Sequence, residues 1–153
     1  MKFSFAKYYL ILSFLVLSMT GCNDNVISSI PDLPVYLQLN LVTTYPTFRN
    51  SYDKFLLFKK PVFVTDRIGY GGILVYTGFD GGYYAFDLSC PYEAKQDILV
   101  VPDVDKGQAV CEGCGSIFDI GYGNGYPVSG KAKQVLKRYK ATLQGDILFI
   151  TQN

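Results

Sequence analysis

Apolar and polar residues alternate along much of the chain, which is the pattern of half-buried β-strands. Residues 35–41 show it most clearly, because Val35, Leu37, Leu39 and Leu41 share one face of the predicted strand. Further strands are predicted at residues 61–65, 73–76, 83–86, 135–143 and 147–151. Helical periodicity is scarce. The pattern therefore predicts an all-β domain.

Two of the turns between these strands carry the chemistry of tight hairpins. Residues 78–82 read Gly-Phe-Asp-Gly-Gly, and residues 144–146 read Gln-Gly-Asp. Glycine and aspartate accept the turn conformations that join adjacent antiparallel strands. We therefore expect hairpins at 73–86 and 135–151, whereas residues 51–58 are expected to form a helical turn.

The first residues have the composition of an export signal. Lys2 and Lys7 precede or flank an apolar run at residues 8–17, which is too short to span a bilayer comfortably. The run ends in Gly21-Cys22, the small residue and cysteine that a lipoprotein signal peptidase accepts. We predict a signal peptide at 1–21, with Cys22 as the lipidated N-terminus. The alternatives are an ordinary cleaved signal with an incidental cysteine, or an uncleaved anchor.

This leader places the protein in the bacterial cell envelope, attached to a membrane through lipid at Cys22 and facing the periplasm or the exterior. Residues 22–34 are polar and rich in turn-forming residues, so they are predicted to be a tether without fixed structure, and residues 35–153 a single domain. Removing the two leader lysines from the 14 basic residues leaves 12 against 13 acidic residues, a net charge of −1. A nucleic-acid partner is therefore not expected.

Three further cysteines lie in two predicted loops. Cys90 is followed by Pro91 and Tyr92, and after 18 further residues comes Cys111-x-x-Cys114-Gly. Thiolates are suitable ligands for zinc and for iron–sulfur clusters. By itself this spacing is a moderately specific indication of a metal site at Cys90, Cys111 and Cys114.

The surrounding residues resemble the Rieske family over most of the span from residue 35 to 151. The motifs occur in the family's order: 85–87, 90–91, 111–119, 127–132 and a closing hairpin. In that family the loops read Cys-x-His and Cys-x-x-His-Gly, and two cysteines bind one iron while two histidines bind the other. Here Tyr92 and Cys114 replace the histidines, and the chain contains no histidine. The resemblance implies an antiparallel β sandwich or barrel with an inserted metal-loop subdomain at about 86–130. The missing histidines exclude a normal Rieske centre.

Three interpretations of the altered site remain. A [2Fe–2S] cluster would place Cys90 and Cys111 on one iron, and Cys114 with Tyr92, Glu93 or an external ligand on the other. A zinc ion would take the three thiolates and a carboxylate such as Glu93, or water. If the loops pack as they do in the family, a Cys90–Cys111 or Cys111–Cys114 disulfide is the third possibility, and it leaves one odd thiol. We expect this last state, without a cofactor.

The expected function follows from the missing histidines. Serines such as Ser116 and Ser129 have no imidazole to activate them, and the chain has no room for a separate catalytic iron domain, so an enzyme is not expected. We predict a lipid-anchored, non-catalytic binding or structural module that contacts another envelope protein. The alternatives are an electron-transfer protein with an atypically ligated [2Fe–2S] centre, or a zinc-stapled module.

Overall fold

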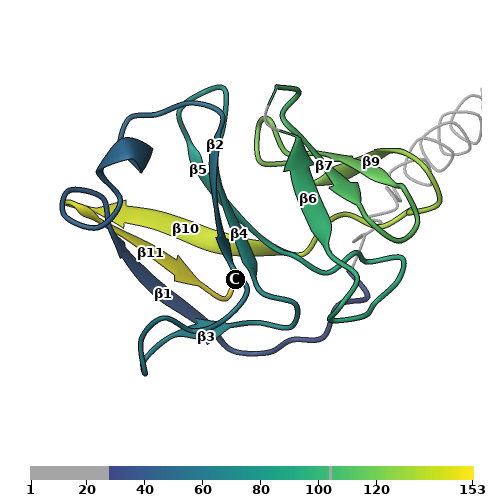
Figure 1. Ribbon diagram of the computed structural model, residues 1–153, viewed down its shortest axis with the longest axis horizontal. Helices are drawn as coiled ribbons and strands as arrows, with labels where there is room; N and C mark the ends of the chain where they lie inside the picture. The colour runs from purple at the N-terminus through teal and green to yellow at the C-terminus, as the bar shows by residue number, and fades with distance from the viewer. Residues whose placement is uncertain (1–27, 104) are drawn as a thin grey trace, which may run out of the picture.

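The computed structural model describes residues 28–103 and 105–153 (Figure 1). The predicted signal peptide, Cys22 and the first part of the predicted tether lie outside the described residues. Within the described parts, no helix has the length and apolar character needed to cross a bilayer. The described chain is built from strands and one short 3-10 helix at Pro46–Phe48, which confirms the predicted all-β fold.

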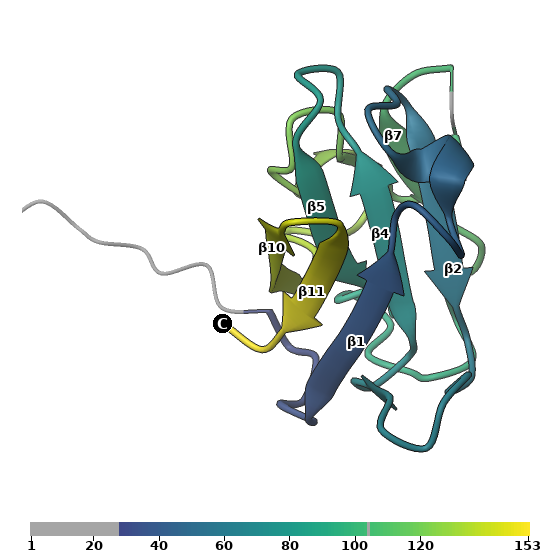
Figure 2. The same cartoon turned by 90° about the vertical axis from the view of Figure 1, so that its left-hand side faces the viewer.

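A seven-stranded antiparallel sheet makes up the larger part of the domain. Its spatial order is β2-β4-β5-β10-β11-β1-β3. The strands are β1 (Val35–Asn40), β2 (Lys54–Phe58), β3 (Arg67–Ile68), β4 (Ile73–Thr77), β5 (Tyr83–Asp87), β10 (Arg138–Gln144) and β11 (Ile147–Thr151). The sheet curls so that β1 crosses in front of β4 (Figure 2).

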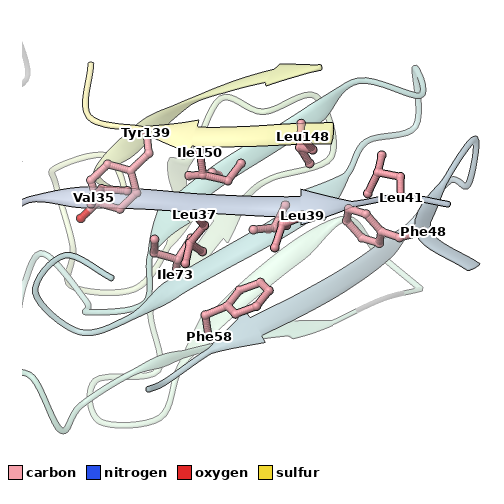
Figure 3. Close-up of a cluster of buried hydrophobic side chains, with 12 residues drawn as sticks. Val35, Leu37, Leu39, Leu41, Phe48, Phe58, Ile73, Tyr139, Leu148 and Ile150 are labelled. Atoms are coloured by element: carbon pink, nitrogen blue, oxygen red, sulfur yellow. The ribbon is translucent and has the colours of Figure 1, made fainter. Parts of the chain in front are cut away.

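The alternating pattern of β1 arises because one face of this strand lines the inside of the curled sheet. Val35, Leu37 and Leu39 of β1 are buried, while the residues between them are more exposed. They pack with Ile73 of β4 and Ile150 of β11 in one hydrophobic cluster (Figure 3). Because burial of each such side chain contributes about 1.5–3 kcal/mol, this cluster is a main source of stability for the larger sheet.

A second, four-stranded antiparallel sheet is inserted between β5 and β10 (Figure 1). Its order is β6-β7-β8-β9, with bounds Val100–Asp103, Gln108–Cys111, Ile117–Asp119 and Tyr126–Ser129. Side chains from both sheets, including Phe86 and Phe118, form a second buried cluster that also contains Cys90 and Cys111. The predicted inserted metal-loop subdomain is therefore confirmed, and its cysteines lie at the junction of the two sheets.

Both predicted hairpins are present. β4 pairs with β5 from Ile73↔Asp87 to Thr77↔Tyr83, and β10 pairs with β11 through to Gln144↔Ile147. Gly145, at the second turn, has a φ of +60°, the left-handed conformation that favours glycine. Turn chemistry together with flanking alternation was sufficient to predict these elements.

Two local predictions were wrong. Residues 61–65, expected to be a strand, form bends and a turn, because the Asp66 carboxylate accepts hydrogen bonds from the amides of Val62 and Phe63 at 2.9 and 2.8 Å. The expected helical turn at 51–58 is replaced by β2, which pairs along its whole length with β4. The first segment is decided by the aspartate directly after it, and the second by a partner strand further along the chain.

The end of the predicted tether lies against the domain. Ile30 is buried at 4% exposure. The Lys137 ammonium donates hydrogen bonds to the carbonyls of Ile30 and Pro31, at 3.1 and 2.6 Å, and to the Asp32 carboxylate at 2.6 Å. Residues 28–34 therefore have a defined position beside β10, although no strand includes them.

Candidate metal centre

The structure brings the three predicted thiols together. The Sγ atoms of Cys90, Cys111 and Cys114 all lie within 4.8 Å of one another. The Cys90 and Cys114 sulfurs are 3.8 Å apart. Cys90 follows β5, Cys111 ends β7, and Cys114 lies in the turn before β8. Three sulfurs at this spacing can bind a metal.

A buried carboxylate fixes the start of the Cys90 loop. Asp87 is 0% exposed, and its oxygens accept hydrogen bonds from the amides of Tyr70, Gly71 and Ser89 at 3.0, 3.1 and 2.8 Å. The Tyr139 hydroxyl donates a fourth, at 2.6 Å. These donors compensate the buried charge, as burial of a carboxylate requires. Asp87 thereby joins β5, β10 and the segment after β3 directly beside Cys90.

Backbone hydrogen bonds close both cysteine loops. The Ala94 amide donates to the Cys90 carbonyl at 2.8 Å, and the Cys90 amide donates to Ile98 at 3.2 Å. In the second loop the Gly115 amide donates to the Cys111 carbonyl at 3.0 Å. Gly115 has a φ of +68°, so its glycine allows the chain to turn back immediately after Cys114.

Ser116 connects the second loop to the chain that leaves β9. Its buried Oγ accepts hydrogen bonds from the amides of Lys131 and Ala132, each at 2.9 Å. The Cys114 thiol donates to the same oxygen at 3.1 Å. Sequence reasoning assigned no role to Ser116; its position after Cys-x-x-Cys-Gly was the available signal.

The environments of the thiols differ. Burial raises the pKa of Cys90 to about 12; hydrogen bonds from the amides of Glu93 and Tyr92 oppose this effect in part, and the Cys111 thiol adds to it. At Cys114 burial is again the largest effect and raises the pKa, but hydrogen bonds, first with Ser116 and then with the other two thiols, outweigh it, so the pKa lies below its ordinary value.

The two candidate ligands that are not cysteines, Tyr92 and Glu93, do not belong to the cluster of sulfur atoms. Tyr92 is 52% exposed and lines a surface pocket with Lys131, Lys133 and Gln134. Glu93 reaches toward the second loop, since its Oε1 would be 3.4 Å from a Cβ atom at Gly113. Its carboxylate is not among the ligand atoms that lie within 4.8 Å of one another. Tyr92 and Glu93 therefore stay predictions as ligands.

The spacing of the sulfurs tests the cluster that the family resemblance implies. In a Rieske centre the second-loop ligand that corresponds to Cys114 binds the iron opposite the one held by the two cysteines. Here the Cys114 Sγ lies 3.8 Å from the Cys90 Sγ, which is close enough for both sulfurs to bind one metal. With no histidine in the chain, the donor set does not fit a Rieske [2Fe–2S] cluster.

Comparison with known proteins gives structural matches only. No protein-family model and no curated protein matches the chain. The ferredoxin of carbazole 1,9a-dioxygenase from Nocardioides aromaticivorans IC177 is 14% identical, with a TM-score of 0.51, and the match covers 80% of this chain and all of the ferredoxin.

Two further solved structures match less completely. A complex of reduced oxygenase and oxidized ferredoxin in carbazole 1,9a-dioxygenase gives 17% identity and a TM-score of 0.43, covering 63% of this chain and 87% of that chain. A Sphingomonas yanoikuyae B1 ferredoxin gives 20% identity and a TM-score of 0.44, covering 67% and 91%. The first match, together with the two-sheet topology, shows that the chain has the fold of a Rieske-type ferredoxin.

Proposed function

We propose that this protein is a lipid-anchored, non-catalytic envelope module whose Rieske-like domain binds one metal ion, zinc, through Cys90, Cys111 and Cys114. The ion would join the loop after β5 to the loop after β7, and so hold the inserted sheet against the larger one. The domain would then present a rigid surface to another envelope protein. We expected no cofactor from the sequence, and the arrangement of the three thiols supports a bound ion instead.

The observation that carries this proposal is the 3.8 Å separation of the Cys90 and Cys114 sulfurs. Two thiolates bound to one tetrahedral ion, with bonds of about 2.3 Å, lie about 3.8 Å apart. The Cys111 sulfur completes a triangle whose sides do not exceed 4.8 Å. Small side-chain movements would therefore bring all three sulfurs to one ion.

The fourth ligand would come from the open side of the triangle. Cys114 is partly exposed, whereas Cys90 and Cys111 are buried, so the Cys114 side is the one that solvent reaches. Water can take this position, or the Glu93 carboxylate after a change of rotamer, because Glu93 lies within the Cys90 loop. A site with an open position binds metal less tightly than a closed structural site.

A second candidate function is electron transfer, with iron held by the same thiols. It is favoured by the fold shared with a protein named as the ferredoxin of carbazole 1,9a-dioxygenase. A low-potential centre is expected in this case, because anionic thiolates stabilise ferric iron more than neutral imidazoles do.

Cobalt titration tests the metal site directly. The full chain, purified in detergent under reducing and anaerobic conditions and freed of metal by chelation, is titrated with Co²⁺. We expect thiolate-to-cobalt absorption that saturates at one ion per chain. Cys90→Ser, Cys111→Ser and Cys114→Ser should each weaken or abolish the band. Tyr126→Phe, at an exposed position on β9, serves as the control and should leave the band unchanged.

An absence of thiolate-to-cobalt absorption in the folded wild-type protein would overturn the single-ion proposal. Circular dichroism of each variant separates loss of the ligand from loss of the fold. A band that survives Cys114→Ser but not the other two substitutions would remove Cys114 from the ligand set.

The lipid anchor is a separate part of the proposal, supported by the apolar run and the Gly21-Cys22 sequence. Expressed in a bacterium, the full chain should partition into the detergent phase of a Triton X-114 extract. Cys22→Ser should retain the leader and lose the lipid, which mass spectrometry would detect. Lipid-free processing of the wild-type chain would contradict this part and leave the metal site unaffected.

A further inference from the structure

The loop between β2 and β3 carries exposed apolar side chains at its tip. Val62 is 60% exposed, Phe63 59% and Val64 96%. We call residues 59–67 the apolar loop; it lies at the lower edge of the domain in Figures 1 and 2. Three consecutive exposed apolar residues are unusual on a surface that only contacts water.

The apolar loop is held in a defined conformation by its own aspartate. Asp66 is 5% exposed, and its carboxylate accepts hydrogen bonds from the amides of Val62 and Phe63. The Asp66 amide donates to the Phe63 carbonyl at 3.0 Å, and the Arg67 guanidinium donates to the Val64 carbonyl at 2.9 Å. These bonds are made within the loop, and they give its backbone a conformation in which the three apolar side chains are exposed.

The charges around the tip are almost all positive. Lys59 and Lys60 precede the tip, Arg67 follows it, and all three are exposed. Asp66 is the only acidic residue between positions 57 and 70, and its carboxylate is buried and engaged with backbone amides. The surface therefore combines an apolar tip with a basic border.

We propose that the apolar loop is a membrane-contact site, in which Val62, Phe63 and Val64 enter the interfacial region of a bilayer while Lys59, Lys60 and Arg67 contact the phosphates of anionic lipids. Apolar side chains bordered by basic ones are the composition that anionic membrane surfaces select. The site would orient the domain on the bilayer, and it does not depend on the lipid predicted at Cys22 or on the metal.

A lipid surface fits better than a protein partner because the apolar area is small. A stable protein interface involves roughly 20–30 residues on each side. The apolar loop offers three apolar side chains on a narrow projection, which can enter a fluid interface without a matching pocket. The basic border provides charge complementarity to phosphate groups.

The absence of tryptophan from the chain permits a site-specific test. Phe63→Trp in the full-length protein places a single fluorophore at the tip, and Tyr126→Trp places one on β9 as the control, at a residue that is 57% exposed. Each protein is mixed with vesicles made of equal parts phosphatidylcholine and phosphatidylglycerol, with bromine atoms on the acyl chains as quenchers. We expect blue-shifted, quenched emission from position 63 and water-like, unquenched emission from position 126.

The basic border is tested in the same Phe63→Trp background. Lys59→Gln with Lys60→Gln should lower the ratio of inserted to free tip by about fivefold for each lysine removed, on anionic vesicles only. Lys95→Gln with Lys140→Gln changes two exposed lysines elsewhere and should have no effect. Unquenched, water-like emission from position 63 would overturn the proposal. So would a blue shift that needs no lipid and grows with protein concentration, which would indicate contact with a second copy of the chain.

Discussion

The Tyr139 hydroxyl donates a 2.6 Å hydrogen bond to the Asp87 carboxylate across the interface between β10 and β5. Asp87 also accepts a hydrogen bond from the amide of Ser89, the residue before Cys90. Burial, and then the Asp87 charge, raise the pKa of Tyr139, so this hydroxyl keeps its proton and remains a donor. The pair thus links the core of the larger sheet to the loop that carries the first thiol.

Tyr139→Phe is expected to destabilise the domain by about 1.5–3 kcal/mol, the usual contribution of a hydrogen bond to a charged group. The phenylalanine ring fills the same volume, so the loss isolates the hydroxyl. Urea unfolding measures the effect, with Tyr126→Phe as an exposed control that should change stability by less than about 0.5 kcal/mol. Equal urea midpoints for the two variants would show that the hydrogen bond from Tyr139 to Asp87 does not contribute to stability.

Gly130→Ala is expected to disturb the metal loops. Gly130 has a φ of +95°, and a Cβ atom there would lie 2.5 Å from the Ser116 Cα. A backbone atom cannot move away as a flexible side chain can, so left-handed strain and overpacking together should cost about 2–5 kcal/mol.

The matched control is Gly145→Ala, where φ is +60° and no atom lies within 4 Å of the added Cβ. This variant carries the backbone strain alone, about 1–2 kcal/mol, and should bind Co²⁺ as the wild type does. Gly130→Ala should lower both the unfolding free energy and the cobalt absorption. An unchanged cobalt titration in Gly130→Ala would mean that the position of Ser116 does not govern the thiol triangle.

Lys137→Met should release residues 28–34 from the domain. The side chain is 11% exposed, and methionine keeps much of its length but none of its three hydrogen bonds to this segment. Hydrogen exchange of the Ser29, Ile30 and Asp32 amides should become faster, whereas Lys140→Gln, on the adjoining strand β10, should leave it unchanged. Equal protection in Lys137→Met would show that the Lys137 hydrogen bonds do not hold the segment in place.

The ion pair in this segment also has a pH dependence. The hydrogen bond and the positive charge of Lys137 lower the pKa of Asp32 below its ordinary value of 3.8. Asp32 therefore adds stability that is complete above pH 3.8 and is lost as the pH falls through the lower folded-state value. Below that range the difference in exchange between wild type and Lys137→Met should narrow. A constant difference down to full protonation would assign the effect to the carbonyl contacts only.

The hairpins and the first strand could be predicted because their signals are local. Val35, Leu37 and Leu39 alternate with polar neighbours, and Gly145 supplies the conformation that its turn requires. The apolar loop could not be predicted in this way. Val62, Phe63 and Val64 have strand-forming side chains, but the Asp66 carboxylate accepts hydrogen bonds from the amides of Val62 and Phe63, and none of the three is paired in a sheet in the part of the chain that the structure describes.

The sequence predicted only in part how the three cysteines come together. The family resemblance implied that the two loops lie close together, whereas the spacing of Cys90, Cys111 and Cys114 did not fix which sulfurs face one another. The residues that position the cysteine loops could not be predicted from the sequence either. Asp87, Tyr139 and Ser116 act through hydrogen bonds between residues up to 52 positions apart.

Metal analysis of the native protein distinguishes a zinc site from an iron–sulfur cluster and from a disulfide. The full chain is purified anaerobically from cells supplied with both zinc and iron, and zinc, iron and acid-labile sulfide are measured per chain. We expect one zinc ion per chain, no sulfide, and protection of Cys90, Cys111 and Cys114 from alkylation until the metal is removed. Two iron atoms with two sulfides per chain, or no metal with two of the three thiols joined in a disulfide, would contradict it.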